Sequence, residues 1–377
     1  MKKCVAFLTN GLYPCVTGGL EIFHYNFIKA LAKKTQVIAL TLCDKSFQGE
    51  GISVCSTKSP VGRLQTLFTI YFHTKWLIKK RRDIGLIYIP YASQIAFQYY
   101  HAIALAQLFR IPYVLRISAG KMGAARPDFL HEWMFRHSSS RIAVSEPLKL
   151  EYEKRYGYPV EVLPSYLPFT RTSSSKREIR KKLRISQDEL VLLFLGTVKS
   201  IKGPDVLIDA LCFLGSDYLG SNKVKCLFVG GNDFSKSEDM ISALEWRAET
   251  CGVSEYVRFV GKVKYEGVHV YYRASDIFII PSVFEARPLS LAEAIYNGLP
   301  SIGSDIPTIS NTIRDGENGA VFEQGNSQDL ANKIRELVDN PEVLEKYASE
   351  CARESASFDN FQRMVERYYQ IFDQLMR

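Results

Sequence analysis

Short apolar runs alternate with longer stretches of helical periodicity along the whole chain. Apolar runs of about four to eight residues are typical of buried strands, whereas apolar residues spaced three and four apart are typical of helices. In the first half this pattern predicts strands at Val5–Thr9, Val37–Leu42, Leu86–Ile89, Val114–Ile117, Ile142–Val144 and Val160–Leu163. Helices are predicted between them, as at Glu21–Lys33 and Ser93–Phe109. Such alternation indicates a parallel sheet with helices on both faces.

The second half of the chain repeats this rhythm. Its predicted strands are Leu190–Leu195, Lys225–Val229, Val257–Val260, Ile277–Ile280 and Ser301–Gly303. Its predicted helices are Gly203–Phe213, Ser237–Cys251, Tyr265–Arg273 and Leu289–Asn297. Two such series in succession indicate an α/β fold of two doubly wound, Rossmann-like domains.

The domain boundary is expected near Pro164–Ser175, where two prolines precede three consecutive serines. This composition is typical of a linker. We therefore expect a first domain at residues 1–168 and a second at residues 176–357, which opens with a basic helix over Lys176–Arg184. The tail, Phe358–Leu375, carries apolar residues at helical spacing and is predicted to form a docked helix.

The composition is that of a globular protein, since 46% of the 377 residues are hydrophobic and 23% are charged. The eight cysteines include no CxxC pair, which disfavours a disulfide scaffold or a structural zinc site and favours the reduced thiols of a cytoplasmic protein. The longest apolar stretch, Ile95–Phe109, falls short of the roughly 20 residues that a membrane helix needs. The apolar run near the start of the sequence is too short to be the core of a signal peptide.

Positive charge is concentrated in the first half of the chain. Residues 1–165 hold 22 Lys and Arg against 10 Asp and Glu, whereas residues 166–377 hold 26 against 30. A basic face attracts anions such as phosphates or acidic lipid headgroups, and scattered solvated lysines account for part of the surplus. None of the sequence patterns typical of nucleic-acid-binding modules is present, so we expect no nucleic-acid partner.

The stretch Leu64–Arg82 combines aromatic and aliphatic residues with four consecutive cations at its end. This combination suits an anionic membrane surface, which would make the protein peripheral on the inner face of the membrane. The alternative is an ordinary helix whose apolar side joins the first-domain core, and we favour it because the apolar residues are too many for one exposed stripe.

Two loops at the predicted carboxyl ends of strands suit a phosphate ligand. Gly18 and Gly19 precede the first helix, where their backbone amides can approach a phosphate, although a glycine pair is also ordinary turn chemistry. Lys199 and Lys202 follow the strand that ends at Leu195 and can neutralise a diphosphate, although an exposed soluble loop has the same composition.

The most informative segment is Pro281–Ala294. A strand ends at its start, a loop carries Glu285, and a helix begins about Pro288. The free amides of the first helical turn, at Leu289 and Ser290, form a ready anion site. Glu285 and Glu293 repel phosphate, so we expect them to bind hydroxyl groups of a sugar or ribose; a solvated glutamate is the alternative for either one alone.

The Glu285-x7-Glu293 segment resembles the signature of retaining GT-B glycosyltransferases, specifically glycosyltransferase family 4. Further segments resemble the family in the same order along nearly the whole chain: Gly18–Glu21, Ala143–Ser145, Tyr156-Gly157, Val162–Pro164, Gly196–Gly203, Gly298–Pro300, Ser304-Asp305 and Asp315–Gly319. The resemblance implies a GT-B fold with a cleft between the domains, and a C-terminal helix, residues 358–377, that crosses back to the first domain.

The resemblance also implies roles for individual residues. Lys202, with Lys199, would contact the donor diphosphate, and Glu285 would hold the hydroxyls of the transferred sugar. Glu293 would bind the nucleotide ribose. Glu285 and Lys202 are therefore the predicted catalytic residues.

Four more positions complete the implied donor site. The amides around Leu289 and Ser290 would cap a phosphate, and Gly18 and Gly19 would close on the diphosphate from the first domain. The base would lie against the loop at Lys262 and Val263.

The sequence departs from the family pattern at several positions. Thr197 stands where the family has an arginine, Ser118 where it often has a histidine, and Asn311 where a glutamate is common. Arg116 and Lys121 flank Ser118, and these three residues are predicted to face an anionic acceptor.

The charges suggest how such a reaction proceeds. Breaking a sugar–phosphate bond leaves negative charge on the diphosphate, which the lysines and the helix start stabilise. A DxD motif is absent, and we expect neither a metal nor a cofactor beyond the nucleotide-sugar co-substrate. Retention of configuration can proceed by attack of the acceptor hydroxyl from the face of the leaving group, in which case Glu285 is an orienting residue. The alternative is a double displacement, which needs a carboxylate on the opposite face of the sugar.

We therefore expect a retaining, metal-independent glycosyltransferase that moves a sugar from a UDP- or GDP-linked donor to a glycan or lipid-linked acceptor in cell-envelope polysaccharide synthesis. Two alternatives stay open: a catalytically silent donor-binding subunit, motivated by Thr197 and Ser118, and a GT-B epimerase that acts without an acceptor.

Overall fold

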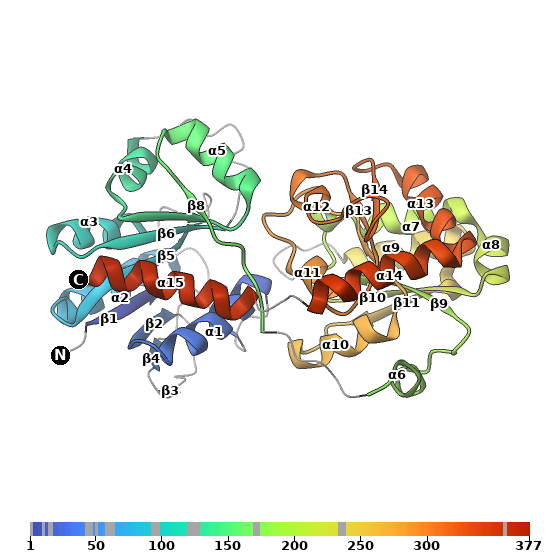
Figure 1. Ribbon diagram of the computed structural model, residues 1–377, viewed down its shortest axis with the longest axis horizontal. Helices are drawn as coiled ribbons and strands as arrows, with labels where there is room; N and C mark the ends of the chain where they lie inside the picture. The colour runs from blue at the N-terminus through green and yellow to red at the C-terminus, as the bar shows by residue number, and fades with distance from the viewer. Residues whose placement is uncertain are drawn as a thin grey trace. The chain divides into compact units, whose positions relative to one another are not determined.

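The protein divides into two compact units in the computed structural model (Figure 1). The described residues are 3–9, 12–13, 18–41, 48–49, 52–56, 65–91, 99–118, 129–168, 174–232, 239–356 and 360–377. The first unit comprises Met1–Pro168 and Asp359–Arg377, and the second comprises Phe169–Phe358. Each unit is a Rossmann-like α/β domain built on its own sheet, which confirms the fold class expected from the sequence.

The first unit is built on an eight-stranded sheet with the order β3-β4-β2-β1-β5-β6-β7-β8. Seven of its strands are parallel, and β3 pairs antiparallel with β4 at one edge. The strands are β1 (Cys4–Leu8), β2 (Val37–Thr41), β3 (Gln48–Gly49), β4 (Ile52–Ser56), β5 (Ile84–Tyr91), β6 (Tyr113–Ile117), β7 (Ser140–Ala143) and β8 (Glu161–Val162). The central strands β1, β5 and β6 are almost wholly apolar and buried, as a sheet covered on both faces requires.

In the described part of this unit, five helices follow its strands: α1 (Gly19–Ala32), α2 (Gln65–Lys80), α3 (Tyr100–Leu108), α4 (Phe129–His137) and α5 (Glu146–Tyr156). The helix predicted from Ser93 begins at Tyr100 in the described part of the chain, and residues 92–98 lie outside it. None of the described helices of the protein is both long and apolar enough to span a membrane.

The C-terminal helix α15 (Asn360–Met376) belongs to the first unit, where it lies against α1 and β5 (Figure 1). Its aromatic face meets the core, since the ring of Tyr368 lies 4.8 Å from that of Phe27 and the ring of Phe372 lies 6.0 Å from that of Tyr88. The return of the tail to the first domain is thus observed.

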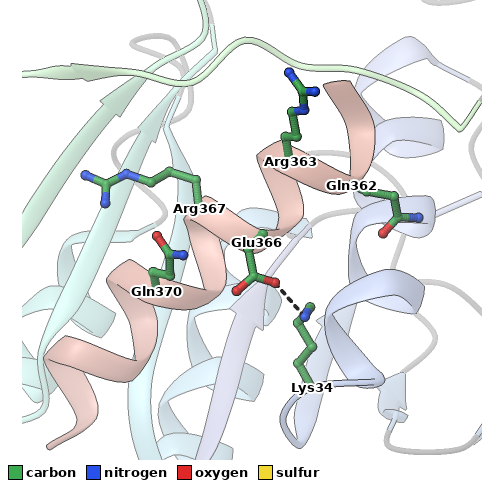
Figure 2. Close-up of a pocket in the computed structure, with 6 residues that line it drawn as sticks. All are labelled: Lys34, Gln362, Arg363, Glu366, Arg367 and Gln370. Carbon is green, nitrogen blue, oxygen red and sulfur yellow. Dashed lines mark ion pairs between the residues drawn. The ribbon is translucent and has the colours of Figure 1, made fainter. Parts of the chain in front are cut away.

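A pocket of about 380 Å³ opens beside α15 on the first unit. Its lining residues are Lys34, Gln362, Arg363, Glu366, Arg367 and Gln370. Figure 2 shows the ion pair from Lys34 Nζ to Glu366 Oε2, which measures 2.6 Å and ties α15 to the end of α1. Among the residues that the structure describes, none of those predicted to bind a donor or acceptor lines this pocket.

The second unit is built on a six-stranded parallel sheet with the order β11-β10-β9-β12-β13-β14. Its strands are β9 (Leu190–Leu195), β10 (Val224–Val229), β11 (Val257–Gly261), β12 (Ile277–Ile280), β13 (Ser301–Ser304) and β14 (Gly319–Phe322). The chain order reverses between β9 and β12, the place at which doubly wound sheets bind ligands beyond the carboxyl ends of their strands.

Nine α-helices cover this sheet within the described residues: α6 (Lys176–Leu183), α7 (Pro204–Leu214), α8 (Ser216–Ser221), α9 (Met240–Thr250), α10 (Tyr265–Ala274), α11 (Leu289–Tyr296), α12 (Pro307–Ser310), α13 (Ser327–Asp339) and α14 (Pro341–Ala356). Two short 3₁₀ helices complete it, η2 (Ser200–Lys202) and η3 (Ser254–Tyr256). Apolar side chains fill both layers between the sheet and the helices.

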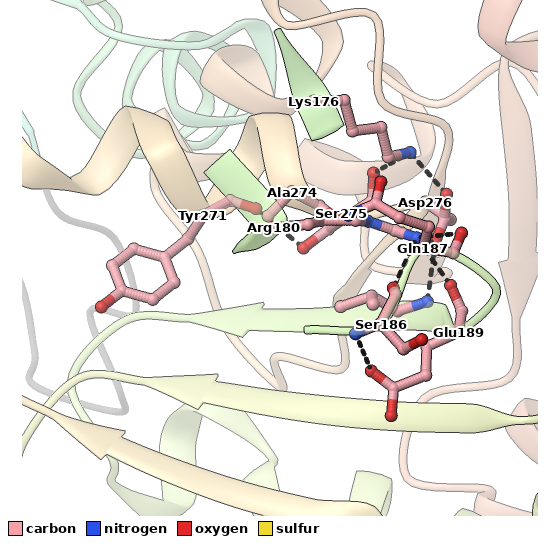
Figure 3. Close-up of polar contacts among 10 residues, drawn as sticks. Lys176, Arg180, Ser186, Gln187, Glu189, Tyr271, Ala274, Ser275 and Asp276 are labelled. Atoms are coloured by element: carbon pink, nitrogen blue, oxygen red, sulfur yellow. Dashed lines mark hydrogen bonds and ion pairs between the residues drawn. The ribbon is translucent and has the colours of Figure 1, made fainter. Parts of the chain in front are cut away.

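The basic helix α6 is anchored by a buried arginine, as Figure 3 shows. Arg180 donates to the carbonyl oxygens of Ala274 and Glu189 at 2.9 Å each and pairs with Asp276 at 2.6 Å. Asp276 also accepts from Lys176 Nζ at 2.5 Å and from the backbone amide of Val191 at 2.7 Å. The network joins α6 to the starts of β9 and β12, so that the first helix of the unit is fixed to its central strands.

The expectation of reduced thiols is wrong at one place. Cys212 on α7 and Cys251 at the end of α9 form a disulfide across 39 positions of sequence, whereas Cys4, Cys55, Cys226 and Cys351 are free. The sequence offered no sign of this pair because its two cysteines are far apart along the chain and meet only through the packing of α7 on α9.

Candidate functional site

Two loops of the second unit meet at the carboxyl edge of its sheet. The first leaves β9 and contains η2, and the second leaves β12. The amide of Val283 donates to the carbonyl oxygen of Ile201 at 3.0 Å, which joins them. Gly203 ends η2 with φ +64°, and a Cβ there would collide with the carbonyl oxygen of Pro281, so only glycine suits this close approach.

The contact between these loops brings together the two predicted catalytic residues. Lys202 Nζ lies 2.5 Å from Glu285 Oε1. The same oxygen accepts from the Ser282 hydroxyl at 3.0 Å. The Glu285 side chain is 10% exposed and that of Lys202 27%, so this is a largely desolvated charge pair. Such a pair holds both side chains in one geometry more firmly than an exposed pair does.

The backbone of Glu285 is fixed as well. The hydroxyl of Thr308, on α12, donates to the Glu285 carbonyl oxygen at 2.9 Å. The Ser304 hydroxyl donates to the carbonyl oxygen of Ser282 at 2.6 Å and is itself fully buried at the end of β13. The end of β13 and the helix α12 therefore hold the loop that presents the carboxylate.

The helix that follows this loop is α11. Pro288 is its N-cap residue, and the helical hydrogen bonds begin where the amide of Ala292 donates to the Pro288 carbonyl oxygen at 3.3 Å. The amides of Leu289 and Ser290 precede that ladder, and both residues are half-buried. A helix start of this kind stabilises an anion through its amides and its dipole.

Glu293 lies one turn further along α11 and is buried, with 8% of its surface exposed. Its Oε1 accepts from the Tyr265 hydroxyl at 2.9 Å, and its Oε2 from the Tyr272 hydroxyl at 3.0 Å. Burial raises the pKa of Glu293 to about 7, while the two phenol donors act in the opposite direction.

The remaining predicted donor residues lie at three places, only one of which is beside Lys202. Lys199 is half-buried at the start of η2, beside Lys202. Lys262 is exposed and Val263 half-buried, directly after β11 at the same edge of the sheet. Gly18 and Gly19 are the N-cap and first residue of α1, in the first unit.

The predicted acceptor residues follow or belong to β6. The Arg116 side chain is 1% exposed, with its guanidinium 4.3 Å from the Phe23 ring and bonded to the Ser165 hydroxyl. It therefore lies in the interior of the first unit. Ser118 directly follows the strand, and Lys121 lies outside the described residues.

Sequence reasoning missed four residues that hold the two glutamates: Ser282, Thr308, Tyr265 and Tyr272. The two tyrosines carried a signal, because positions seven apart on α10 lie on one face of the helix. The two hydroxyl residues carried none, since serine and threonine are common in any loop.

The sequence of the second unit matches a known family. Residues 175–354 match the family model described as glycosyl transferases group 1. The chain is 28% identical over 195 residues to a D-inositol 3-phosphate glycosyltransferase of Geodermatophilus obscurus, and 28% identical over 189 residues to one of Streptomyces coelicolor. These alignments cover 52% and 49% of this chain but only 42% and 40% of the relatives' own length.

Similar solved structures extend over the whole chain. Anabaena Alr3699/HepE in complex with UDP and glucose has a TM-score of 0.79 at 17% identity, with 99% of this chain and 100% of that chain covered. WaaG, a glycosyltransferase involved in lipopolysaccharide biosynthesis, has a TM-score of 0.75 at 18% identity, with 98% and 99% covered. Residues 175–354 thus match the glycosyl transferases group 1 family, in a chain whose two Rossmann-like domains have the fold of the GT-B glycosyltransferases.

Proposed function

We propose that the protein is a retaining glycosyltransferase that moves a sugar from a UDP- or GDP-linked donor to a hydroxyl of a glycan or lipid-linked acceptor. The observation that carries the proposal is the Lys202–Glu285 pair beside the start of α11, inside the region that matches the family. It puts a cation, free helix amides and a carboxylate at one edge of the sheet.

This arrangement suits the chemistry of sugar transfer. The bond from the anomeric carbon to the phosphate oxygen breaks, and Lys202, Lys199 and the amides of Leu289 and Ser290 stabilise the departing diphosphate. The acceptor oxygen bonds to the anomeric carbon from the same face, and its proton passes to the leaving phosphate oxygen. Glu285 orients the sugar by accepting from its hydroxyls. This balance of charge needs no metal ion in the step.

The donor is proposed to be a sugar nucleotide because two independent features support it. Glu293 lies one turn beyond the start of α11, so a phosphate bound at that start would bring an attached ribose toward its carboxyl group. Solved structures with the same fold hold UDP, or UDP-glucose in another complex of Alr3699/HepE. WaaG is involved in lipopolysaccharide biosynthesis, which supports a role in cell-envelope polysaccharide synthesis.

We propose further that the first unit lies on the inner face of an anionic membrane through α2. Its outer surface carries Leu67 and Tyr71, each 60% exposed, and Ile78, 42% exposed, next to the exposed cations Lys79 and Lys80. Exposed apolar residues beside cations favour binding to acidic lipids. Another face of α2 joins the core through the buried Leu77. One helix can therefore both pack on the first-domain core and face a membrane.

The experiment that tests the enzyme proposal is incubation with UDP- and GDP-sugars, with acidic and neutral glycolipids as acceptors and with a chelator present. Transfer with retained anomeric configuration supports the proposal. Binding without transfer to any acceptor identifies a silent subunit, and a changed sugar without an acceptor identifies an epimerase. Failure to bind any sugar nucleotide contradicts all three.

A further inference from the structure

Glu293 is held on both sides by phenols of one helix. Tyr265 begins α10 and Tyr272 lies near its end, and their hydroxyls reach the two oxygens of the same carboxyl group at 2.9 and 3.0 Å. Tyr272 is 2% exposed, whereas Tyr265 is half-buried and lies on the more open side of the carboxyl group.

The number of available protons gives this arrangement two states. A phenol carries a single hydroxyl proton, yet the Tyr272 hydroxyl lies 3.0 Å from both Glu293 Oε2 and the Ser290 carbonyl oxygen. When Glu293 is ionised, Tyr272 can donate to the carboxylate. When Tyr272 donates to Ser290 instead, Glu293 keeps a hydrogen bond to Tyr272 only by carrying a proton of its own.

The electrostatic surroundings keep the two states close in free energy. In the part of the chain that the structure describes, burial and these two phenols are what determine the pKa of Glu293, which stands at about 7. Burial, and after it the Glu293 carboxylate, in turn raises the pKa of Tyr272 well above its usual value, so the phenol stays protonated. Glu293 is therefore the group that exchanges its proton near neutral pH.

Resting on the proposed function, we infer that Tyr265 and Tyr272 make Glu293 a proton switch in the ribose subsite, so that binding of a sugar nucleotide releases a proton from Glu293 to water. The hydroxyls of a ribose are donors and need an ionised acceptor. The incoming ribose displaces Tyr265 from Oε1, and Tyr272 continues to hold Oε2. The two tyrosines act through Glu293 and are positioning residues.

The test measures affinity against pH with UDP-glucose and GDP-mannose, whose diphosphate diesters do not titrate near neutrality. We expect the dissociation constant to be flat above about pH 8 and to rise roughly tenfold per pH unit below about pH 7. Calorimetry in two buffers of different ionisation enthalpy should show proton release at pH 6 to 7, about half a proton or more.

Three variants distinguish a loss of the proton switch from a general loss of donor binding. Glu293→Gln should abolish the pH dependence and weaken binding at high pH. Tyr265→Phe removes a donor to the ionised state and should move the midpoint to higher pH. Tyr271→Phe, a matched control on the same helix, should leave the wild-type profile unchanged.

Carbon-13 NMR titration of the Glu293 carboxyl in the unliganded protein provides a readout that does not depend on a donor. A midpoint near 7 that rises in Tyr265→Phe supports the switch; a midpoint near that of an exposed glutamate overturns it. Binding with a flat pH profile overturns the coupling alone. Failure of both sugar nucleotides to bind at every pH overturns the proposed function and the coupling with it.

Discussion

Lys202 and Glu285 are bonded to each other, although the proposed reaction needs both groups to contact the donor. The two residues lie 83 positions apart in the chain and meet at 2.5 Å. In the proposed reaction the donor diphosphate competes with Glu285 for the Lys202 ammonium, so donor binding must loosen this pair. Glu285 is then free to accept from sugar hydroxyls while Ser282 still holds its Oε1.

Replacing Lys202 should therefore damage the chemical step more than it damages binding. For Lys202→Met we expect kcat to fall by about 100-fold to 1000-fold, because a preorganised cation facing the leaving group is lost. The measurement is the steady-state rate of sugar transfer, with the donor dissociation constant determined by calorimetry. Lys181→Met, which changes an exposed lysine of α6, is the matched control. An equal loss in both variants would contradict the assigned role.

Buried histidines make the first unit sensitive to acid. Burial, and to a smaller extent the neighbouring His101, lowers the pKa of His73 to about 3, and burial lowers that of His101 to about 4. Because the unfolded value is near 6.5, their contribution to stability is complete above that pH and is lost progressively as the pH falls below it. His73 alone should then lower the unfolding free energy by about 2 kcal/mol at about pH 5.

The comparison that tests this is urea unfolding at about pH 8 and pH 5. His73→Leu should lose less stability between the two pH values than the wild type. The exposed His137, replaced by glutamine, serves as the control and should leave the difference as it is. The same acid-induced loss in His73→Leu would show that His73 is not its source.

The sequence was sufficient to single out the side chains at this scale but not the contacts between them. Glu285 and Lys202 stood out because few residue types grip hydroxyls and diphosphates. Tyr265 and Tyr272 donate to Glu293 only because α10 lies beside α11, and no local sequence pattern predicts that arrangement. The Cys212–Cys251 disulfide was not predicted, because it too depends on how two helices pack.

At the scale of elements, the boundaries follow local signals where those signals are strong. β9 and β12 were predicted with the bounds they have, because each is a continuous apolar run ended by glycine or proline. β14 and β4 were missed: the first has four residues and starts at a glycine, and the second mixes apolar and polar positions and lies next to the edge strand of its sheet. Such strands are defined by their neighbours more than by their own residues.

The position of α6 likewise depends on its neighbours, because Arg180 bonds to groups beside β9 and β12. Arg180→Met should destabilise the second unit by about 3–5 kcal/mol, because Asp276 loses its buried partner and several carbonyl oxygens lose their donor. Thermal unfolding followed through Trp246, in the second unit, measures the loss. Arg177→Met changes an exposed arginine of the same helix and should cost well under 1 kcal/mol. Similar losses in both variants would rule out the anchor.

At the scale of the whole molecule, the chain leaves the first unit near Pro168 and returns to it with α15. The first unit is therefore incomplete until α15 has been made. Phe372 shows this dependence directly: it is fully buried, with its ring 6.0 Å from that of Tyr88 on β5 and 5.8 Å from that of Tyr368.

Truncating Phe372 should accordingly weaken one unit and spare the other. Phe372→Ala leaves a cavity over β5 and should cost the first unit about 3–5 kcal/mol. In hydrogen exchange, amides of β1 and β5 should exchange faster, whereas amides of β9 and β12 should keep their wild-type rates because the core of the second unit is made of its own residues. Gln374→Ala, an exposed position of the same helix, should change neither. Faster exchange in both units would mean that they unfold together, in which case α15 would stabilise the whole protein and not the first unit alone.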